Sequence, residues 1–348
     1  MLKRAHWPIL MLTLALAGCG GGGGGGGTPA PTSGTGGTSN SNVTTIAPGS
    51  GTASSTSTSA SSGGTSSGST TATGQPINVN GFQYPQGVAV YGSTLYVANT
   101  DGATISAIAL DQPNYPVTTI QLNYSGHNNY TLVKPTGLAV SKDGTTLYAA
   151  NWTSPSSNGG GFIDAIALNG TTTATVTPLV TTGLNNPDGL AVSADGNSLF
   201  VANHGIQDVV QISTQSATLG QILNTYSTNG PYPFSVYEDS SGNLYATALD
   251  STTNSNVVLK WAPGAPSNPT TLVPAGTLAG AGGITGANGE LYIANYSAQT
   301  ISKVDPASGT ILATVSVAGY QPNMLAHDAT RLYFTDSNSG SVNAIPLP

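Results

Sequence analysis

From residue 77 onward, the chain consists of short apolar runs separated by turns. In the stretch that begins at Pro187, GLAVS predicts a short strand and SLFVAN predicts the next one, with the tight turn ADGN between them. DVVQIS and GQILNTYS follow and predict two more strands. β-branched and aromatic residues dominate these runs, and the spacing of an amphipathic helix is absent, so the unit is predicted to be four antiparallel strands.

This unit occurs six times. A Leu-Tyr pair, or Leu-Phe in the third copy, marks the second strand of each unit: Leu95-Tyr96, Leu147-Tyr148, Leu199-Phe200, Leu244-Tyr245, Leu291-Tyr292 and Leu332-Tyr333, at steps of 52, 52, 45, 47 and 41 residues. Repeats of about 40 to 50 residues are typical of β-propeller blades, whose two apolar faces must be covered by neighbouring blades. We therefore predict an all-β fold, a six-bladed propeller of four-stranded antiparallel blades over residues 76–348. Two smaller β domains or a sandwich are the alternatives.

The two ends of the repeat region complement each other. The sixth unit runs from about Pro322 to Pro348 and ends after its third strand, SVNAIPL. An isolated strand, INVN at Ile77–Asn80, precedes the first unit, in the slot that VTTIQL at Val117–Leu122 fills ahead of the second. We expect the N-terminal strand to complete the last blade and so close the ring, which would leave no blade open.

The repeat resembles that of NHL and related six-bladed propellers. The shared features are a Pro-x-Gly-apolar-Ala-Val opening, an Asp-Gly turn and a Leu-Tyr-Val-Ala-Asp or -Asn strand end. The resemblance covers residues 77–348 and is most specific in the first three units, whereas Ala248 replaces the usual Asp or Asn of the fourth and Ala281 the proline of the fifth. Lactonase-like members of this class bind a divalent cation through a Glu in the first blade. Here the two glutamates, Glu238 and Glu290, fall in the fourth and fifth blades, which disfavours lactonase activity.

The first 75 residues read as an export signal and a linker. Lys3 and Arg4 precede an apolar core from Trp7 to Leu16, and the segment ends in LAGC at Cys19, the single cysteine of the chain. This resembles a bacterial lipoprotein signal over residues 1–19, which implies lipidation of Cys19 and attachment to a membrane. An ordinary signal peptide with an incidental cysteine is the alternative. Gly20, in place of Asp, implies the outer membrane of the cell envelope.

Residues 20–75 are almost all Gly, Ser, Thr, Ala and Pro, and this composition predicts a disordered tether. In the whole chain, charged residues make up 6%, against about 25% in typical proteins, and the net charge is −7. No basic patch exists, so nucleic acid is not an expected partner.

One face of the ring is predicted to carry the function. The turns between the first and second strands of each blade, such as SKDG and SADG, are short, whereas the loops at the other face, such as NWTSPSSNGGG and ALDSTTNSN, look longer and more varied. Variable loops on a rigid scaffold commonly carry binding sites. The candidate ligand-binding residues on this rim are Gln86, Thr136, Trp152, Asp188, His204, Tyr232, Phe234, Asp250, Tyr296 and Asn323. Their aromatic and amide character suits a neutral polar ligand, a glycan or a peptide. An uncommitted loop surface is the alternative.

Two sets of residues that recur from blade to blade are predicted to be structural. Gly87, Gly137 and Gly189 open the inner strands, where the blades crowd the axis. Asn or Asp ends the second strand in five blades and is expected to hydrogen-bond the following turn. Asp188 is different, because its counterparts in the other blades are Gln86, Thr136, Phe234, Gly282 and Asn323. It could be a ligand or a base, or it could cap a turn.

Signals for catalysis are weak. His127, His204 and His327 could form a zinc triad, but His327 lies within a strand and is expected to pack between blades. The one Gly-x-Ser-x-Gly match, from Gly64 to Gly68, falls within the predicted tether, where no strand precedes it and no helix follows, and no phosphate-binding loop occurs. We predict an envelope lipoprotein that presents the propeller as a binding or scaffold module for a protein, peptide or glycan. No catalytic residue, metal ligand or cofactor is assigned. The alternative is a metal-assisted hydrolase or lyase with its site in the central funnel, which would use a divalent cation such as calcium.

Overall fold

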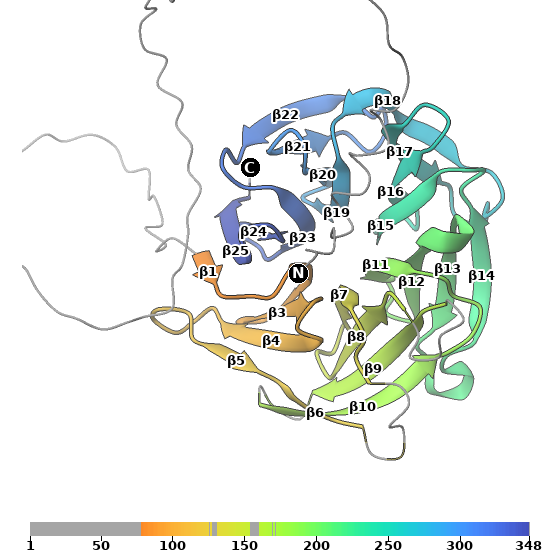
Figure 1. Ribbon diagram of the computed structural model, residues 1–348. Coiled ribbons are helices and arrows are strands. Elements are labelled where there is room, and N and C mark those ends of the chain that lie inside the picture. The colour runs from red at the N-terminus through yellow and green to blue at the C-terminus, as the bar shows by residue number, and fades with distance from the viewer. Residues whose placement is uncertain are drawn as a thin grey trace, which may run out of the picture. The chain divides into compact units, whose positions relative to one another are not determined.

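The computed structural model describes residues 78–124, 126, 131–153, 160–168, 170 and 172–347. All of them belong to one compact unit. Cys19 and the segments predicted to be the signal and the tether lie outside the described residues. Six β-sheets are arranged in a ring around a central axis (Figure 1), and the prediction of a six-bladed β-propeller is confirmed. No helix in the described residues is both long enough and apolar enough to cross a bilayer.

The blades follow one another along the chain, each with its first strand nearest the axis. Blade 1 contains β2 (Pro85–Tyr91), β3 (Thr94–Asn99), β4 (Thr104–Ala109) and β5 (Val117–Thr119). Blade 2 contains β7 (Pro135–Val140), β8 (Thr146–Asn151), β9 (Phe162–Leu168) and β10 (Thr173–Val180), joined by β6 (Gln121–Asn123). Blade 3 contains β11 (Pro187–Val192), β12 (Ser198–Asn203), β13 (Asp208–Ser213) and β14 (Ile222–Ser227), with the short 3-10 helices η1 (His204–Ile206) and η2 (Ser216–Thr218).

The second half of the ring repeats the arrangement. Blade 4 contains β15 (Tyr232–Glu238), β16 (Leu244–Asp250), β17 (Ser255–Trp261) and β18 (Thr270–Leu278). Blade 5 contains β19 (Ala281–Ala287), β20 (Glu290–Asn295), β21 (Thr300–Val304) and β22 (Ile311–Ser316). Blade 6 contains β23 (Pro322–His327), β24 (Arg331–Asp336), β25 (Ser341–Pro346) and β1 (Asn78–Asn80).

Each second strand is apolar on both faces because it packs against two neighbouring blades. In β12, Leu199 and Val201 join the core shared with blade 2, whereas Phe200 joins the core shared with blade 4. An unbroken apolar run is therefore what the position requires. Such cores fill all six blade boundaries, which explains why the unit must repeat.

The N-terminal strand closes the ring, as predicted. β1 pairs antiparallel with β25, with Asn78 opposite Asn343 and Val79 opposite Val342. Val79 is 1% exposed and belongs to the core between blades 6 and 1. The two ends of the described chain therefore share one sheet, and neither the last nor the first blade is left with an open apolar face.

The outer strand of blade 1 differs from its prediction. VTTIQL divides into two short strands: β5 pairs with β4, whereas β6 crosses to blade 2 and pairs in parallel with the outer edge of β10. Ile120, between them, is buried in the core of blades 1 and 2, and its N–H donates to the carbonyl of Ile105 at 2.9 Å. Because an apolar residue is needed at this crossing, the chain covers the edge of blade 2 with a fifth strand.

Candidate functional site at the channel mouth

The six inner strands begin at one face, and the second strands end there. We call it the variable face. The prediction of long loops on it is wrong for five blades: the connections between second and third strands at 100–103, 204–207, 251–254, 296–299 and 337–340 have four residues each. Only the connection in blade 2, residues 152–161, is longer. The differences between blades therefore lie mainly in the side chains that the same short loops and strand starts present.

A ring of six residues surrounds the axis at this face. Each inner strand has a register irregularity at its start, for example between Pro187 and Leu190, and such bulges re-aim the residues within them. The residues at this level, which we call the mouth ring, are Gln86, Thr136, Asp188, Phe234, Gly282 and Asn323. They are the same six that the repeat alignment placed in one column.

Glycines hold the members of the mouth ring close together. A Cβ on Gly137 would lie 2.1 Å from the carbonyl oxygen of Asp188, and one on Gly87 would lie 2.2 Å from that of Thr136. A Cβ on Gly189 would lie 2.8 Å from the carbonyl oxygen of Phe234. The predicted steric role of these glycines is confirmed, and Asp188 is placed directly between its neighbours Thr136 and Phe234.

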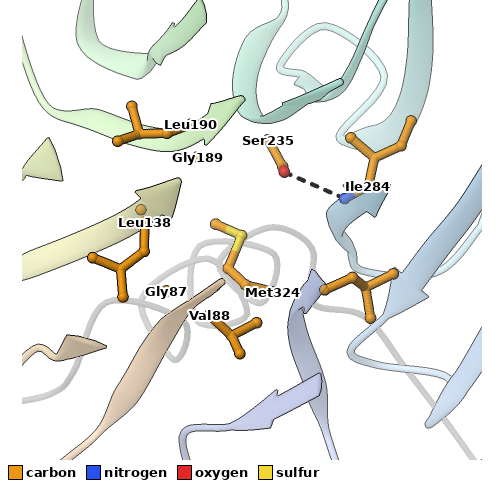
Figure 2. Close-up of a pocket in the computed structure, with 10 residues that line it drawn as sticks. Gly87, Val88, Leu138, Gly189, Leu190, Ser235, Ile284 and Met324 are labelled. Atoms are coloured by element: carbon orange, nitrogen blue, oxygen red, sulfur yellow. Dashed lines mark hydrogen bonds between the residues drawn. The ribbon is translucent and has the colours of Figure 1, made fainter. Parts of the chain in front are cut away.

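The channel beneath the mouth ring is nearly filled. Its cavity measures about 30 Å³ and is lined by the glycines and by aliphatic side chains, with Met324 reaching toward the middle (Figure 2). The Ser235 hydroxyl accepts a hydrogen bond from the Ile284 N–H at 3.3 Å across the same space (Figure 2). A cavity of this size holds about two waters and no metabolite. A ligand of metabolite size therefore does not fit in this cavity.

Four of the predicted rim residues meet in one aromatic cluster. The His204 ring centroid lies 5.4 Å from that of Trp152, 5.3 Å from that of Tyr232 and 5.1 Å from that of Phe234. His204 itself is buried, whereas the three other rings are half-buried and present part of their surface to solvent. The aromatic cluster, defined by these four residues, spans blades 2, 3 and 4 and reaches the axis through Phe234.

The imidazole at the centre of the cluster is neutral and has a fixed tautomer. His204 Nδ1 lies 3.1 Å from the carbonyl oxygen of Pro233. A carbonyl oxygen only accepts, so Nδ1 carries the proton and Nε2 carries the lone pair. Burial lowers the pKa of His204 to about 4, and the hydrogen bond to Pro233 opposes this only in part.

Asp188 is a buried carboxyl that no described residue hydrogen-bonds. It is 7% exposed and makes no hydrogen bond with any described residue. Burial raises its pKa to about 8, because the charged form loses its hydration and gains no donor in return. The predicted turn-capping role is not observed. Instead, the one acid of the mouth ring is held mostly protonated at neutral pH.

The polar neighbours of Asp188 in the ring differ in how they are used. Thr136 donates its hydroxyl hydrogen to the carbonyl of Pro187 at 2.9 Å and so ties blade 2 to blade 3. Asn323 donates to the hydroxyl of Ser337 at 3.0 Å. Gln86 is 7% exposed, and its Oε1 has no hydrogen-bond donor among the described residues. Gln86 and Asp188 therefore both carry acceptor atoms that no described residue satisfies.

The two remaining candidates serve their own parts of the ring. The Tyr296 hydroxyl accepts a hydrogen bond from Asn338 Nδ2 at 2.9 Å, which links blades 5 and 6. Asp250 accepts hydrogen bonds from the Thr252 N–H at 2.8 Å and the Thr253 hydroxyl at 3.0 Å. These bonds lower the pKa of Asp250 and brace its own loop. Neither residue belongs to the aromatic cluster.

The recurring asparagines are structural, but they do not make the hydrogen bonds to the following turn that were predicted for them, and Oδ1 of Asn99 and of Asn295 has no donor among the described residues. Asn99 Nδ2 donates to the hydroxyls of Thr104 and Ser106, both at 3.0 Å, and Asn295 does the same to its counterparts in blade 5. Asn203 donates to Asp208 at 2.9 Å and accepts from the Asn185 N–H at 2.7 Å. These side chains hold the loop to the third strand. Their hydrogen bonds favour the structural role over that of a polar ring above the channel.

One buried acid was missed by the sequence interpretation. Asp164 on β9 is fully buried; its Oδ2 accepts from Asn151 Nδ2 at 3.0 Å, and its Oδ1 has no donor among the described residues. Burial raises its pKa to about 7. The available signal was an acid within the apolar run FIDAIAL.

The two histidines that the structure describes, His204 and His327, are not gathered into one site. His327 packs between blades as predicted, with Nδ1 at 3.2 Å from the Thr285 hydroxyl of blade 5, whereas His204 lies in the aromatic cluster. His127 lies outside the described residues. Within the described residues, no group of three or more His, Cys, Asp or Glu side chains is placed to hold a metal ion.

Comparisons with known proteins support the fold. Residues 94–241 match the family model described as Lactonase, 7-bladed beta-propeller, which is less than half of the chain, whereas the structure closes with six blades. A comparison with curated proteins gave no match.

Several solved structures have the same fold at low sequence identity. Hydrazine synthase of Kuenenia stuttgartiensis is 17% identical with a TM-score of 0.56, covering 75% of this chain and 83% of that one. The PQQ-bound aldose sugar dehydrogenase of Streptomyces coelicolor is 15% identical with a TM-score of 0.56, covering 76% and 95%. Virginiamycin B lyase of Staphylococcus aureus with quinupristin is 17% identical with a TM-score of 0.54, covering 78% and 87%. At this level of identity, the likeness shows a β-propeller and says nothing of activity.

Proposed function

We propose that this protein is a binding module that captures a protein, peptide or glycan ligand on the variable face of its propeller. The observation that carries the proposal is the aromatic cluster. Three half-buried rings are fixed around the buried imidazole of His204, with centroid distances of 5.1 to 5.4 Å. Rings held in this way offer apolar contact area at a low cost in side-chain entropy, which favours binding of sugar faces or of apolar and aromatic side chains.

The nearly filled channel supports a surface site over a buried one. Because its cavity measures only about 30 Å³, a ligand of metabolite size would contact the mouth ring and the aromatic cluster from above. The polar groups there are few, and few precisely placed polar groups beside apolar surface are typical of ligand sites.

The proposal includes a location. The LAGC sequence ending at Cys19 supports export and lipidation of that residue, and residues 20–75 would act as a tether between the lipid and the propeller. A flexible chain of this length spans roughly 40 Å. We place the protein in the bacterial cell envelope, at the outer membrane, and its repeats among those of the NHL type.

A second candidate is a metal-assisted hydrolase or lyase. The match to a lactonase family model over residues 94–241 favours it, as does Asp188, since burial brings its pKa to about 8, within the range of a general acid or base. The described residues offer no cluster of three acidic, histidine or cysteine ligands beside it. The binding module is therefore the better supported candidate.

Binding measurements on the full chain in detergent test the proposal. A glycan and peptide panel should yield a ligand that Trp152→Ala binds at least tenfold more weakly, because the variant removes one face of the cluster. The matched control is Tyr91→Ala, since Tyr91 is 45% exposed but lies at the opposite face. Equal losses in both variants, or no saturable binding by the panel, would contradict the proposal. Ca²⁺-dependent lactone hydrolysis lost in Asp188→Asn would favour the enzyme instead.

A further inference from the structure

We propose that the mouth ring receives the ammonium group of a primary amine, while the carbon skeleton of the ligand lies on the aromatic cluster. This inference rests on the proposed binding function and specifies the chemistry of the ligand. It is carried by two acceptors of the mouth ring that no described residue satisfies, and by the uncharged rings beside them.

The first observation is the isolation of the Asp188 carboxyl. It is 7% exposed and receives no hydrogen bond from any described residue. A carboxyl so deeply buried is costly in its ionised form unless a cation or several donors face it. The described residues supply neither, so a cationic ligand group would complete this environment and favour the ionised carboxyl.

The second observation is that Gln86, in the same mouth ring, also carries an acceptor without a donor among the described residues. Its Oε1 is buried and has no donor. Two acceptors without donors call for a ligand group that donates more than one hydrogen bond. A primary ammonium has three N–H donors, and its bonds to a carboxylate are roughly twice as strong as neutral hydrogen bonds.

The third observation concerns the rings next to Asp188. Phe234 is its immediate neighbour in the mouth ring, and the Phe234 ring centroid lies 5.1 Å from that of His204. Cations are attracted to the faces of aromatic rings. His204 does not oppose this attraction, because burial lowers its pKa to about 4 and leaves the imidazole uncharged at neutral pH. With a net charge of −7, the chain as a whole also attracts cations.

A neutral hydroxyl ligand is the competing chemistry, and pH separates the two. An ammonium pairs with the ionised carboxyl, so its affinity should rise about tenfold per pH unit below the Asp188 pKa of about 8 and level off above it. A neutral ligand that accepts a hydrogen bond from the protonated carboxyl would bind more weakly as the pH rises above 8.

Several other titratable groups lie near β11. His204 on η1 and Tyr232 on β15 lie at the same face, and Lys134 immediately precedes β7. Tyr148, Tyr237 and Glu238 lie further along β8 and β15, toward the opposite face. Burial is the main cause of the raised pKa of Tyr84, and the charges of Tyr296, Asp101 and Asp188 add to it. Because several groups are present, the pH profile must be compared between the parent and Asp188→Asn.

The test is calorimetry on the full chain in detergent with an isosteric pair, 2-phenylethylammonium and 2-phenylethanol. At pH 8.5 we expect the amine to bind at least tenfold more tightly than the alcohol. Asp188→Asn should abolish that preference and flatten the pH profile. Asp250→Asn should retain both, since Asp250 braces its own loop. Gln86→Leu should weaken binding of the amine but not of choline, whose quaternary nitrogen has no N–H.

Measurements on the parent protein alone can overturn the inference. Equal affinity for amine and alcohol, no saturable binding of the amine, or an amine affinity that falls between pH 6 and 8 would each do so, whether or not the variants fold. Alcohol binding that Trp152→Ala abolishes, without any amine preference, would overturn the inference and leave the proposed binding function in place.

Discussion

The Nδ1 atom of His204 lies 3.1 Å from the carbonyl oxygen of Pro233, and this contact ties blade 3 to the inner strand of blade 4. It also fixes the central ring of the aromatic cluster. Because the carbonyl accepts only from a protonated nitrogen, the bond selects one tautomer of the neutral imidazole, and the three surrounding rings exclude the water that would favour the charged form.

We expect His204 to stay neutral at pH values well below those at which histidines usually become protonated. Its pKa of about 4 in the folded chain lies below the value of 6.5 expected after unfolding. Its contribution to stability is therefore complete above pH 6.5 and is lost as the pH falls toward 4, up to about 3 kcal/mol. Nitrogen NMR should show the Nδ1–H tautomer at pH 6, and His204→Phe should remove this acid-side loss. A histidine that titrates near 6.5 would contradict the assignment.

The contribution of Asp164 to stability should depend on pH in the opposite sense to that of His204. Its pKa is about 7 in the folded chain, above the 3.8 of the unfolded one. The unfolded chain loses the proton first, so stability is complete below pH 3.8 and is lost as the pH rises to 7, by about 4 kcal/mol. Chemical denaturation at pH 8 should find Asp164→Asn more stable than the parent by a few kcal/mol, and the gain should vanish at pH 4.

An exposed acid provides the control for Asp164. Asp143 accepts hydrogen bonds from the Ser141 hydroxyl at 2.7 Å and the Thr145 N–H at 3.0 Å, and these bonds lower its pKa. Asp143→Asn should therefore not stabilise the protein at pH 8. If both variants gain stability equally, a general reduction of negative charge is responsible, and burial of Asp164 is not.

The closure of the ring should depend on Val79. The residue is 1% exposed, so Val79→Asp would bury an unpaired charge in the core between blades 6 and 1. We expect a loss on the order of 3 kcal/mol and increased aggregation, because the edge of β25 becomes available for pairing. Asn80→Asp, at the exposed next position, should be nearly neutral. Thermal unfolding compares the two, and similar midpoints would exclude closure by β1.

The close approach of the inner strands should not tolerate a methyl group. In Gly137→Ala the new Cβ would lie 2.1 Å from the carbonyl oxygen of Asp188, a backbone atom, so the neighbouring inner strand would have to shift. We expect a loss of about 2 to 3 kcal/mol. Gly102→Ala is the control, because its nearest neighbour is the end of the Gln83 side chain at 3.0 Å. Equal unfolding free energies in the two variants would show that the blades can separate.

Much of this fold could be predicted from spacing alone. The LY pairs count the blades, and the Asp-Gly turns locate the hairpins. The missing strand at the C-terminus, paired with INVN at the N-terminus, predicts the closure that β1 and β25 make. Prediction was poorer where the local sequence pattern and the packing between blades favour different structures. VTTIQL reads as one strand, but burial of Ile120 between two blades divides it.

By itself, the sequence determined which residues share a level of the ring, because a repeat forces equivalent positions to occupy equivalent places. It therefore identified Asp188 as the one acid of the mouth ring. Only the tertiary structure decided what that acid experiences. Burial and the absence of a donor depend on residues from other blades, which are distant in the chain. The same is true of Trp152, His204, Tyr232 and Phe234, which come from three blades and become one cluster only when the ring packs together.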